Sequence, residues 1–289
     1  MDLFSLAERK LSEIDFVAFD TEATGYSNFS DCLLEVAGVR FRRHQGAWTK
    51  AAEFAELVCP DRPIPAETIA IHGITDDQVA SAAPAVVVLD RFFAFAKDAV
   101  LIVHYAPSDV GFMAFAYARA GRDVPGVHVV DTFPLAKKLC PGIAHYSLES
   151  LAAALALPAP THRALPDAVA TRALFETAVG RLGSPEEIPL GNVLEHSGPP
   201  LTLEEFSHIS ITLPENLTPV GEALASARDV TLTYRGGTKG SGPRRVTPSH
   251  YFARQGHVFL EAYCHLDREM KSFRVDRIES VSLVAEGPA

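Results

Sequence analysis

Two acidic residues follow an apolar segment near the start of the chain, in the stretch Phe19-Asp20-Thr21-Glu22-Ala23-Thr24-Gly25. The preceding run from Ile14 to Phe19 is typical of a buried strand. Side chains two positions apart on a strand point to the same face, so Asp20 and Glu22 are expected to project together. Hard divalent cations bind such paired oxygen ligands. An isolated Asp-x-Glu is more simply a surface turn, so the rest of the chain decides.

Two later segments supply further acids. Asp109 comes shortly after a second apolar strand, Ala99 to Val103, at the start of a segment with helical apolar spacing. Asp167 follows Pro166, a residue suited to a first helical turn, and His162 stands five positions earlier. Taken alone, each of these acids is a favourable charge at a helix N-terminus, and His162 is a loop histidine.

Together, the four carboxylates and the histidine resemble in set and order the DEDDh family of 3′-to-5′ exonucleases. The resemblance covers about residues 13 to 182, and the motifs FDTEATG and HRALPDA match the family pattern closely. In the second motif the family usually has Asn where Tyr105 stands, and often Phe where Ser108 stands. The resemblance implies an α/β fold of the ribonuclease H-like type, a mixed sheet with helices on both faces.

The resemblance also implies a two-metal phosphodiester hydrolase. Asp20 would bridge two Mg²⁺ ions, for which Mn²⁺ substitutes, and Glu22, Asp109 and Asp167 would complete their coordination. His162 would take a proton from the attacking water, a role that suits histidine, whose side chain titrates near pH ~6.5.

Four further residues are expected to contact the substrate. Ile71-His72-Gly73-Ile74-Thr75 is similar to an element of proofreading-type members in which the histidine approaches the 3′-terminal nucleotide. The alternative is a capped turn, with Thr75 at the N-cap of the next helix. Close approach of the backbone to a nucleotide favours small residues, which adds Thr24 and Gly25, and Thr21 of the same motif completes the set.

The order of elements indicates an α/β domain over residues 1–182. Strands are expected at 15–20, 33–42, 53–58, 100–104 and 127–130. Helices are expected at 76–81, 86–97, 110–120, 132–139, 148–155 and 167–182. Glycine and proline then become frequent, so residues 183–228 are expected to be a linker with short helices.

From residue 229 to about 285 the pattern is β. Alternation at Val230–Tyr234 is followed by three more strand-like segments. This region resembles the WYL domain, a small SH3-like β-barrel, with the best match at Phe273-Arg274-Val275-Asp276-Arg277-Ile278. In that family a basic groove binds nucleic acid or another ligand. The resemblance assigns this role to Arg244, Arg245, Arg274 and Arg277, because guanidinium groups match phosphate geometry. Ordinary solvated surface charge is the alternative.

The composition of the chain indicates its partners and its cellular environment. Its net charge is −10, but residues 228–277 hold ten Lys and Arg against five Asp and Glu, which leaves −15 for the remainder. This asymmetry suggests that the C-terminal part meets an anion, and the acidic remainder fits binding of single-stranded ends better than a grip on long duplex. No apolar stretch approaches the ~20 residues of a membrane span. The four cysteines are scattered, which indicates a reducing cytoplasm.

These features predict a metal-dependent 3′-to-5′ exonuclease that releases nucleoside monophosphates from single-stranded DNA, with a C-terminal module that binds nucleic acid or a regulatory ligand. Trimming of short RNA is an alternative substrate. A catalytically silent binding protein or a ligand-sensing regulator is the alternative from another class, although the presence of all five site residues argues against it. No residue pattern requires a homo-oligomer.

Overall fold

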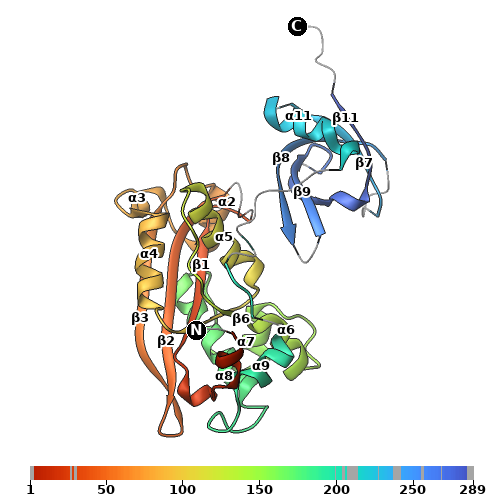
Figure 1. Cartoon of the computed structure of the whole chain (residues 1–289). Helices are drawn as coiled ribbons and strands as arrows, with labels where there is room; N and C mark the ends of the chain where they lie inside the picture. Colours follow the sequence, from red (N-terminus) through yellow and green to blue (C-terminus); the bar gives the residue numbers. More distant parts are fainter. Residues whose placement is uncertain are drawn as a thin grey trace. The chain divides into compact units, whose positions relative to one another are not determined.

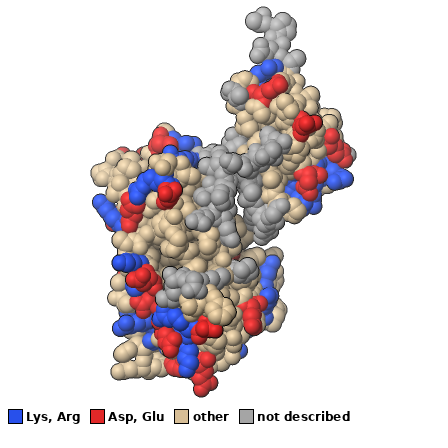
Figure 2. Space-filling view, viewed as in Figure 1, with Lys and Arg blue, Asp and Glu red and all other residues tan. Residues whose placement is uncertain are grey.

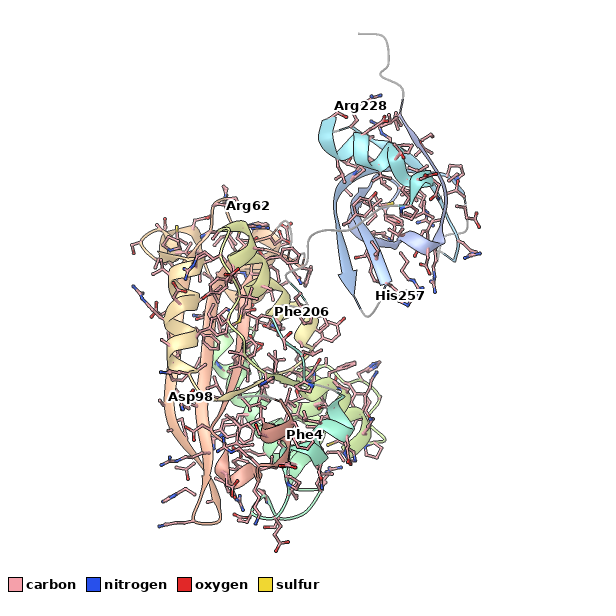
Figure 3. All side chains as sticks on the ribbon, in the orientation of Figure 1. Phe4, Arg62, Asp98, Phe206, Arg228 and His257 are labelled. Carbon is pink, nitrogen blue, oxygen red and sulfur yellow. The ribbon has the colours of Figure 1, made fainter. Side chains whose placement is uncertain are left out.

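The computed structural model describes residues 3–26, 28, 31–198, 200–203, 206, 214–226, 228–236, 242–254, 257–267 and 269–284. The chain divides into two compact units, Met1–Ser207 and His208–Ala289, here called the N-terminal and C-terminal units (Figure 1). Within each unit, side chains fill the space between the sheet and its helices (Figure 3).

A mixed sheet forms the centre of the N-terminal unit. Its strands lie in the order β4-β3-β2-β1-β5-β6. The central strand β1 runs antiparallel to β2 on one side and parallel to β5 on the other. The strand bounds are β1 Phe16–Ala23, β2 Leu33–His44, β3 Ala47–Cys59, β4 Ala83–Pro84, β5 Val100–Val103 and β6 Val129–Asp131.

Alternation along β1 determines which helices cover each face of the sheet. Val17 and Phe19 belong to one buried cluster, which includes residues of α4 and α5. Phe16 and Ala18 belong to another, which includes residues of α6, α8 and α9. The helix bounds are α1 Leu3–Glu8, α2 Ala66–His72, α3 Asp76–Val79, α4 Ala85–Phe95, α5 Ala106–Arg119, α6 Thr132–Leu139, α7 Leu148–Leu155, α8 Ala164–Val179 and α9 Leu190–Ser197. Helices therefore cover both faces of a mixed sheet, as the sequence predicts.

Most differences from the expected elements concern short helices. Helix α2 ends at Gly73, which adopts a left-handed conformation (φ 70°) that glycine reaches without steric cost. Helix α9 lies within the expected linker and packs on α6 and α1. The linker also reaches helix α11, Thr218–Ser226, which packs on strands of the C-terminal unit. Residues 199, 204, 205, 207–213 and 227 of this linker lie outside the described part of the chain.

The C-terminal unit contains an antiparallel five-stranded sheet, ordered β10-β9-β8-β7-β11. Its strands are β7 Val230–Tyr234, β8 Arg244–Arg254, β9 His257–Cys264, β10 Glu269–Arg274 and β11 Ile278–Leu283. Apolar residues of α11 and of the strands form one buried cluster. A separate all-antiparallel domain after the α/β unit confirms the predicted fold class. No described helix is both long enough and apolar enough to cross a bilayer.

Candidate active site

Three of the predicted acids converge at the end of the central strand. Asp20 and Glu22 lie on the same face of β1, the face on which α8 packs. Asp167 lies in the first turn of α8. One carboxylate oxygen from each of the three residues lies within 4.8 Å of the other two. The strand period and the start of one helix thus bring together acids that are far apart in the sequence.

The fourth acid, Asp109, is held in place by Thr21. Asp109 lies in the first turn of α5 and is buried. Its Oδ1 accepts a hydrogen bond from the Thr21 backbone N–H at 2.8 Å and another from the Thr21 hydroxyl at 2.7 Å. Thr21 points away from Asp20 and Glu22, because adjacent residues of a strand face opposite sides. Thr21, which lies between Asp20 and Glu22 in the sequence, therefore holds Asp109 from the opposite face of the sheet.

A cavity of about 830 Å³ joins these acids to His162. All four acids, Thr21 and His162 line it. His162 is exposed and adopts a left-handed backbone conformation (φ 55°) immediately before α8. This arrangement places the ring in the same cavity as Asp167.

The acids are crowded and poorly hydrated. Burial, together with the charges of Asp109, Glu22 and Asp167, raises the pKa of Asp20 well above its ordinary value. Burial and neighbouring acids raise the pKa of Glu22 to about 8. Burial also raises the pKa of Asp109 and of Asp167, although hydrogen bonds from Thr21 and from the Thr161 N–H oppose the shift. The site therefore disfavours its own negative charge.

Divalent cations fit this donor set. The converging ligands are carboxylate oxygens, which Mg²⁺ and Mn²⁺ prefer. A bound cation would favour the ionised form of each acid, and this reverses the upward pKa shifts described above. The residues of the cluster are thus suited in both chemistry and charge to a divalent metal.

A further carboxylate beside the cluster, Glu35, was not predicted from the sequence. Glu35 lies opposite Glu22 on β2 and is 5% exposed. It accepts hydrogen bonds from Arg163 Nη2 at 2.6 Å and Nε at 3.0 Å, and from the Ala164 N–H at 2.9 Å. It thereby ties β2 to the start of α8, beside His162. The signal in the sequence is a single acid within the apolar run Leu33–Val39.

A second missed carboxylate, Asp131, lies at the end of β6. Its Oδ1 accepts hydrogen bonds from the Tyr105 N–H at 2.9 Å and the Phe133 N–H at 2.8 Å. Its Oδ2 accepts one from the Ala106 N–H at 3.0 Å. Asp131 therefore caps the starts of both α5 and α6. The signal is again an acid that directly follows an apolar strand.

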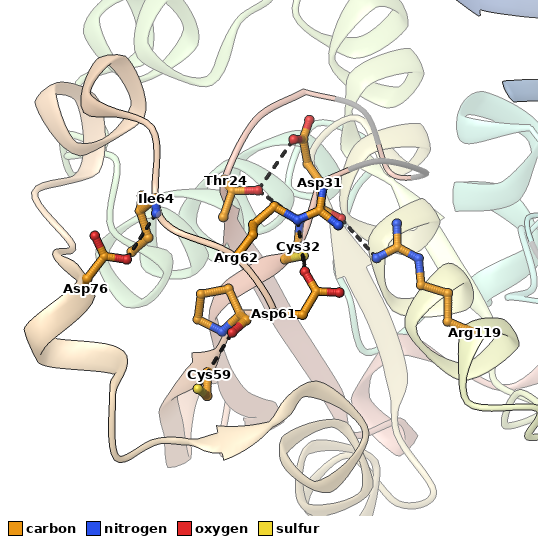
Figure 4. Close-up of polar contacts among 10 residues, drawn as sticks. Thr24, Asp31, Cys32, Cys59, Asp61, Arg62, Ile64, Asp76 and Arg119 are labelled. Carbon is orange, nitrogen blue, oxygen red and sulfur yellow. Dashed lines mark hydrogen bonds and ion pairs between the residues drawn. The ribbon is translucent and has the colours of Figure 1, made fainter. Parts of the chain in front are cut away.

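Two of the residues expected to contact substrate, Thr24 and Gly25, have structural partners of their own, and Figure 4 shows the hydrogen bonds of Thr24. Thr24 is buried, and its hydroxyl accepts a hydrogen bond from the Cys32 N–H at 2.9 Å. Gly25 lies against Asp31, whose Oδ2 would be 2.3 Å from a Cβ at position 25. Neither residue is among those that line the cavity in the described part of the chain. They shape the loop that follows β1.

His72 is buried at the end of α2 and, like Thr24 and Gly25, is not among the described residues that line the cavity. Its Nδ1 accepts a hydrogen bond from the Ile74 N–H at 2.9 Å, so the proton of the neutral ring is on Nε2. Within the described residues Nε2 has no hydrogen-bond partner. Burial and the charge of Arg163 lower the pKa of His72, which favours this neutral form. Thr75 caps α3, as the alternative interpretation of this segment predicts, with Gln78 completing a capping box.

The four arginines expected to bind a ligand in the C-terminal unit lie in different environments. Arg244 is 5% exposed and lies 3.4 Å from the buried carboxylate of Asp267. Arg245 and Arg274 pair with the acids Asp229 and Asp276, and Arg277 is exposed. Among the described residues visible in Figure 2, acidic and basic side chains are interspersed on each unit, without a broad patch of one sign. The structure does not gather the four arginines into one exposed cluster.

Comparison with known proteins agrees with this geometry. The RNase_T family profile, described as Exonuclease, matches residues 17–175, and the WYL domain profile matches residues 215–283. A DNA polymerase III subunit epsilon-like protein of Rhodobacter capsulatus is 37% identical over 175 residues, which is 59% of this chain and 24% of that protein. DNA polymerase III PolC-type of Streptococcus pneumoniae is 38% identical over 151 residues, 52% of this chain and 10% of that protein. The chain spans a quarter or less of the length of these curated relatives.

The solved structures show the same fold. The nuclease domain of 3′hExo, described as a DEDDh family member bound to rAMP, superposes with a TM-score of 0.52 at 17% identity. The match covers 60% of this chain and 95% of that domain. Since the exonuclease profile alone extends over more than half of the sequence, the chain belongs to the exonuclease family of DEDDh type, joined to a WYL domain.

Proposed function

We propose that this protein is a metal-dependent 3′-to-5′ exonuclease that releases nucleoside monophosphates from single-stranded DNA. The observation that carries the proposal is the convergence of Asp20, Glu22 and Asp167 within 4.8 Å, in a cavity that Asp109 and His162 also line. An exposed histidine beside a cluster of acids supplies the two groups that phosphodiester hydrolysis needs, a metal site and a base.

Each residue has a distinct role in this proposal. The four acids that would hold two Mg²⁺ ions are Asp20, Glu22, Asp109 and Asp167, and the ions would supply stabilisation of the attacking and leaving oxygens. His162 takes the proton of the attacking water while the bond between phosphorus and the 3′ oxygen breaks. Thr21 holds the Asp109 carboxylate through its two hydrogen bonds. Glu35 fixes the helix start that follows His162 through Arg163 and Ala164.

His72 is proposed to contact the terminal nucleotide through Nε2. This atom is a buried donor that lacks a partner among the described residues, and an unpaired buried donor is costly unless a ligand accepts its hydrogen bond. A sugar or phosphate oxygen at the 3′ end would satisfy it. Thr21, which lines the cavity, is the other proposed substrate contact, whereas Thr24 and Gly25 are proposed to shape the adjacent loop.

The C-terminal unit is proposed to bind nucleic acid or a regulatory ligand. Arg245, Arg274 and Arg277 remain the candidate contacts, because Arg244 is buried against Asp267. The expected cytoplasmic location rests on the four free cysteines. Short RNA is the alternative substrate, and it requires a partner in the site for the 2′-hydroxyl.

Degradation of 5′-labelled single-stranded DNA and RNA of one sequence tests the proposal. The protein is incubated with Mg²⁺ or Mn²⁺, and the controls are a chelator and Asp20→Ala. A ladder that shortens from the 3′ end and is absent in both controls is the expected result, and the faster strand identifies the preferred sugar. A folded protein that cleaves neither strand would overturn the proposal.

A further inference from the structure

The cavity extends beyond the acids to an aromatic pair, Tyr105 and Phe133. Both side chains line the cavity, as does Lys137. The two ring centroids are 5.5 Å apart, with an interplanar angle of 72°. Lys137 Nζ lies 4.4 Å from the Phe133 ring centroid. Aromatic faces beside a cation are the combination that binds single-stranded nucleic acid without sequence preference.

The backbone of Tyr105 is strained. Its φ of 72° and ψ of 64° are left-handed, a conformation that is unusual for a bulky side chain. Strain of this kind persists where the surroundings impose it, and it concentrates at functional sites. At Tyr105 the strained backbone conformation places an aromatic ring in the wall of the cavity that the acids also line.

One carboxylate oxygen fixes both ring-bearing residues. Asp131 Oδ1 accepts hydrogen bonds from the N–H groups of Tyr105 and Phe133, so the backbones of the two residues are tied to one atom. Asp131 itself is 9% exposed. The pair is thus pre-organised, which limits the entropy lost when a ligand binds.

We infer that Tyr105, Phe133 and Lys137 form a stacking subsite for a nucleobase of the substrate strand, adjacent to the scissile phosphodiester. This inference rests on the proposed function, since the base belongs to the strand whose end enters the acid cluster. Tyr105 stacks on the base, Phe133 supports the Tyr105 ring, and Lys137 contacts a phosphate. The first helical turn of α5, which begins at Ala106, separates this subsite from Asp109.

Binding measurements test the subsite independently of cleavage. Fluorescence anisotropy reports the affinity of the full chain for a 5′-labelled single-stranded oligonucleotide, in an Asp20→Asn background with Mg²⁺. Adding Tyr105→Asn is expected to raise Kd by about 5- to 150-fold, the effect of losing one base–aromatic stack. Tyr105→Phe retains the ring and is expected to leave Kd within about twofold. Asparagine tolerates left-handed backbone, so the variant folds.

A base reporter identifies the stacked position. 2-Aminopurine is placed at the first, second or third nucleotide from the 3′ end, and its fluorescence is expected to be quenched on binding at one position. Tyr105→Asn is expected to abolish that quenching. Equal affinity and equal quenching in the two proteins would overturn the stacking subsite. The two proposals can fail separately. If Tyr105→Asn weakens binding and abolishes quenching but wild-type protein degrades neither strand, the proposed function is wrong and the stacking subsite is supported.

The role of Lys137 is tested by salt dependence, with its neighbour Lys138 as the matched control. Lys138 is also exposed, but it donates a hydrogen bond to the Glu195 carbonyl at 3.1 Å and is not among the cavity-lining residues of the described chain. Lys137→Gln is expected to reduce the slope of log K against log salt by about 0.7, the contribution of one phosphate contact. Equal slopes in Lys137→Gln and Lys138→Gln would refute the phosphate contact.

Discussion

Glu35 and Arg163 are joined by two hydrogen bonds, of 2.6 and 3.0 Å, that connect β2 to the residue preceding α8. His162 and Asp167 flank this junction, which lies opposite Glu22 on the sheet. The ion pair therefore anchors the helix start that carries the proposed base and one proposed metal ligand. Its contribution is to position these groups, because the Glu35 carboxylate is already occupied by Arg163 and the Ala164 N–H.

Replacing Glu35 by Gln is expected to lower the free energy of unfolding by about 1–3 kcal/mol, since a buried charge-assisted pair loses an ionic partner. The turnover number is expected to fall while KM changes little, because His162 and Asp167 lose their fixed geometry. Chemical denaturation and steady-state kinetics measure the two effects. Glu176→Gln is the control, because Glu176 lies on α8, the helix that Glu35 anchors, pairs with Arg172 at i,i+4 and is not among the described residues that line the cavity. An unchanged turnover number in Glu35→Gln would contradict the positioning role.

In the presence of a chelator, which keeps the protein free of metal, its free energy of unfolding is expected to fall as pH rises from about 4.5 to about 8. In the folded chain the pKa of Glu22 is raised from 4.5 to about 8, so the folded state holds this proton more tightly than the unfolded state does. The contribution of Glu22 to the free energy of unfolding is fully present below pH 4.5. It is lost as pH rises through the folded-state pKa of about 8. Thermal unfolding in chelator, compared with Glu22→Gln, measures the difference. The variant is expected to show a shallower decline, and parallel curves would contradict the raised pKa.

Added metal is expected to reverse this trend. Because cations bind the ionised acids, the stabilisation by Mg²⁺ or Mn²⁺ is expected to increase with pH over the same interval. Asp20→Asn is expected to lose most of the metal-dependent rise in melting temperature. A rise of equal size in Asp20→Asn and wild-type protein would show that the metal binds elsewhere.

Asp131→Asn is expected to destabilise the N-terminal unit by about 1–3 kcal/mol. The side-chain amide nitrogen of Asn donates hydrogen bonds and cannot accept the Ala106 N–H, so at least one buried donor loses its partner. Because Tyr105 and Phe133 share the other oxygen, affinity for single strands is expected to fall together with stability. Denaturation and anisotropy on the same preparation check both. A stable variant with unaltered affinity would contradict the role given to Asp131.

A glycine is expected to stabilise the end of α7. Ala156 caps this helix with a φ of 54°, which glycine adopts without the cost borne by an L-residue. Ala156→Gly is therefore expected to raise the unfolding free energy by about 0.4–1 kcal/mol. Ala153→Gly, at an exposed position inside the same helix, is expected to lower it by about 1 kcal/mol. Denaturation midpoints of the two variants on the same side of wild type would contradict the backbone argument.

The α/β class and most strands of the N-terminal unit could be predicted from sequence because apolar runs alternate with helical spacing. The convergence of Asp20, Glu22 and Asp167 could be predicted, because the two strand acids share one face of β1 and Asp167 opens a helix. The role of Glu35 could not be predicted, because it depends on a hydrogen bond from Arg163. That residue comes 128 positions later, and only the tertiary fold brings it to Glu35. Helices α2 and α9 are short, and proline and glycine neighbours conceal their periodicity. The burial of Arg244 depends on Asp267, which a strand pattern does not reveal.

The hydrogen bonds from Tyr105 and Ala106 to Asp131 have an evolutionary consequence. They hold the main chain at position 105 through backbone N–H groups, so the hydrogen bonds that impose this conformation do not involve the side chain there. Under the stacking proposal, exchanging that side chain would alter which strand ends are bound, while the acids and His162 would remain unchanged. The two proposed roles, base stacking and metal binding, are thereby carried by different side chains of one segment, Tyr105 and Asp109. A substitution at this one position would then change the proposed substrate preference without altering the residues that carry the chemistry.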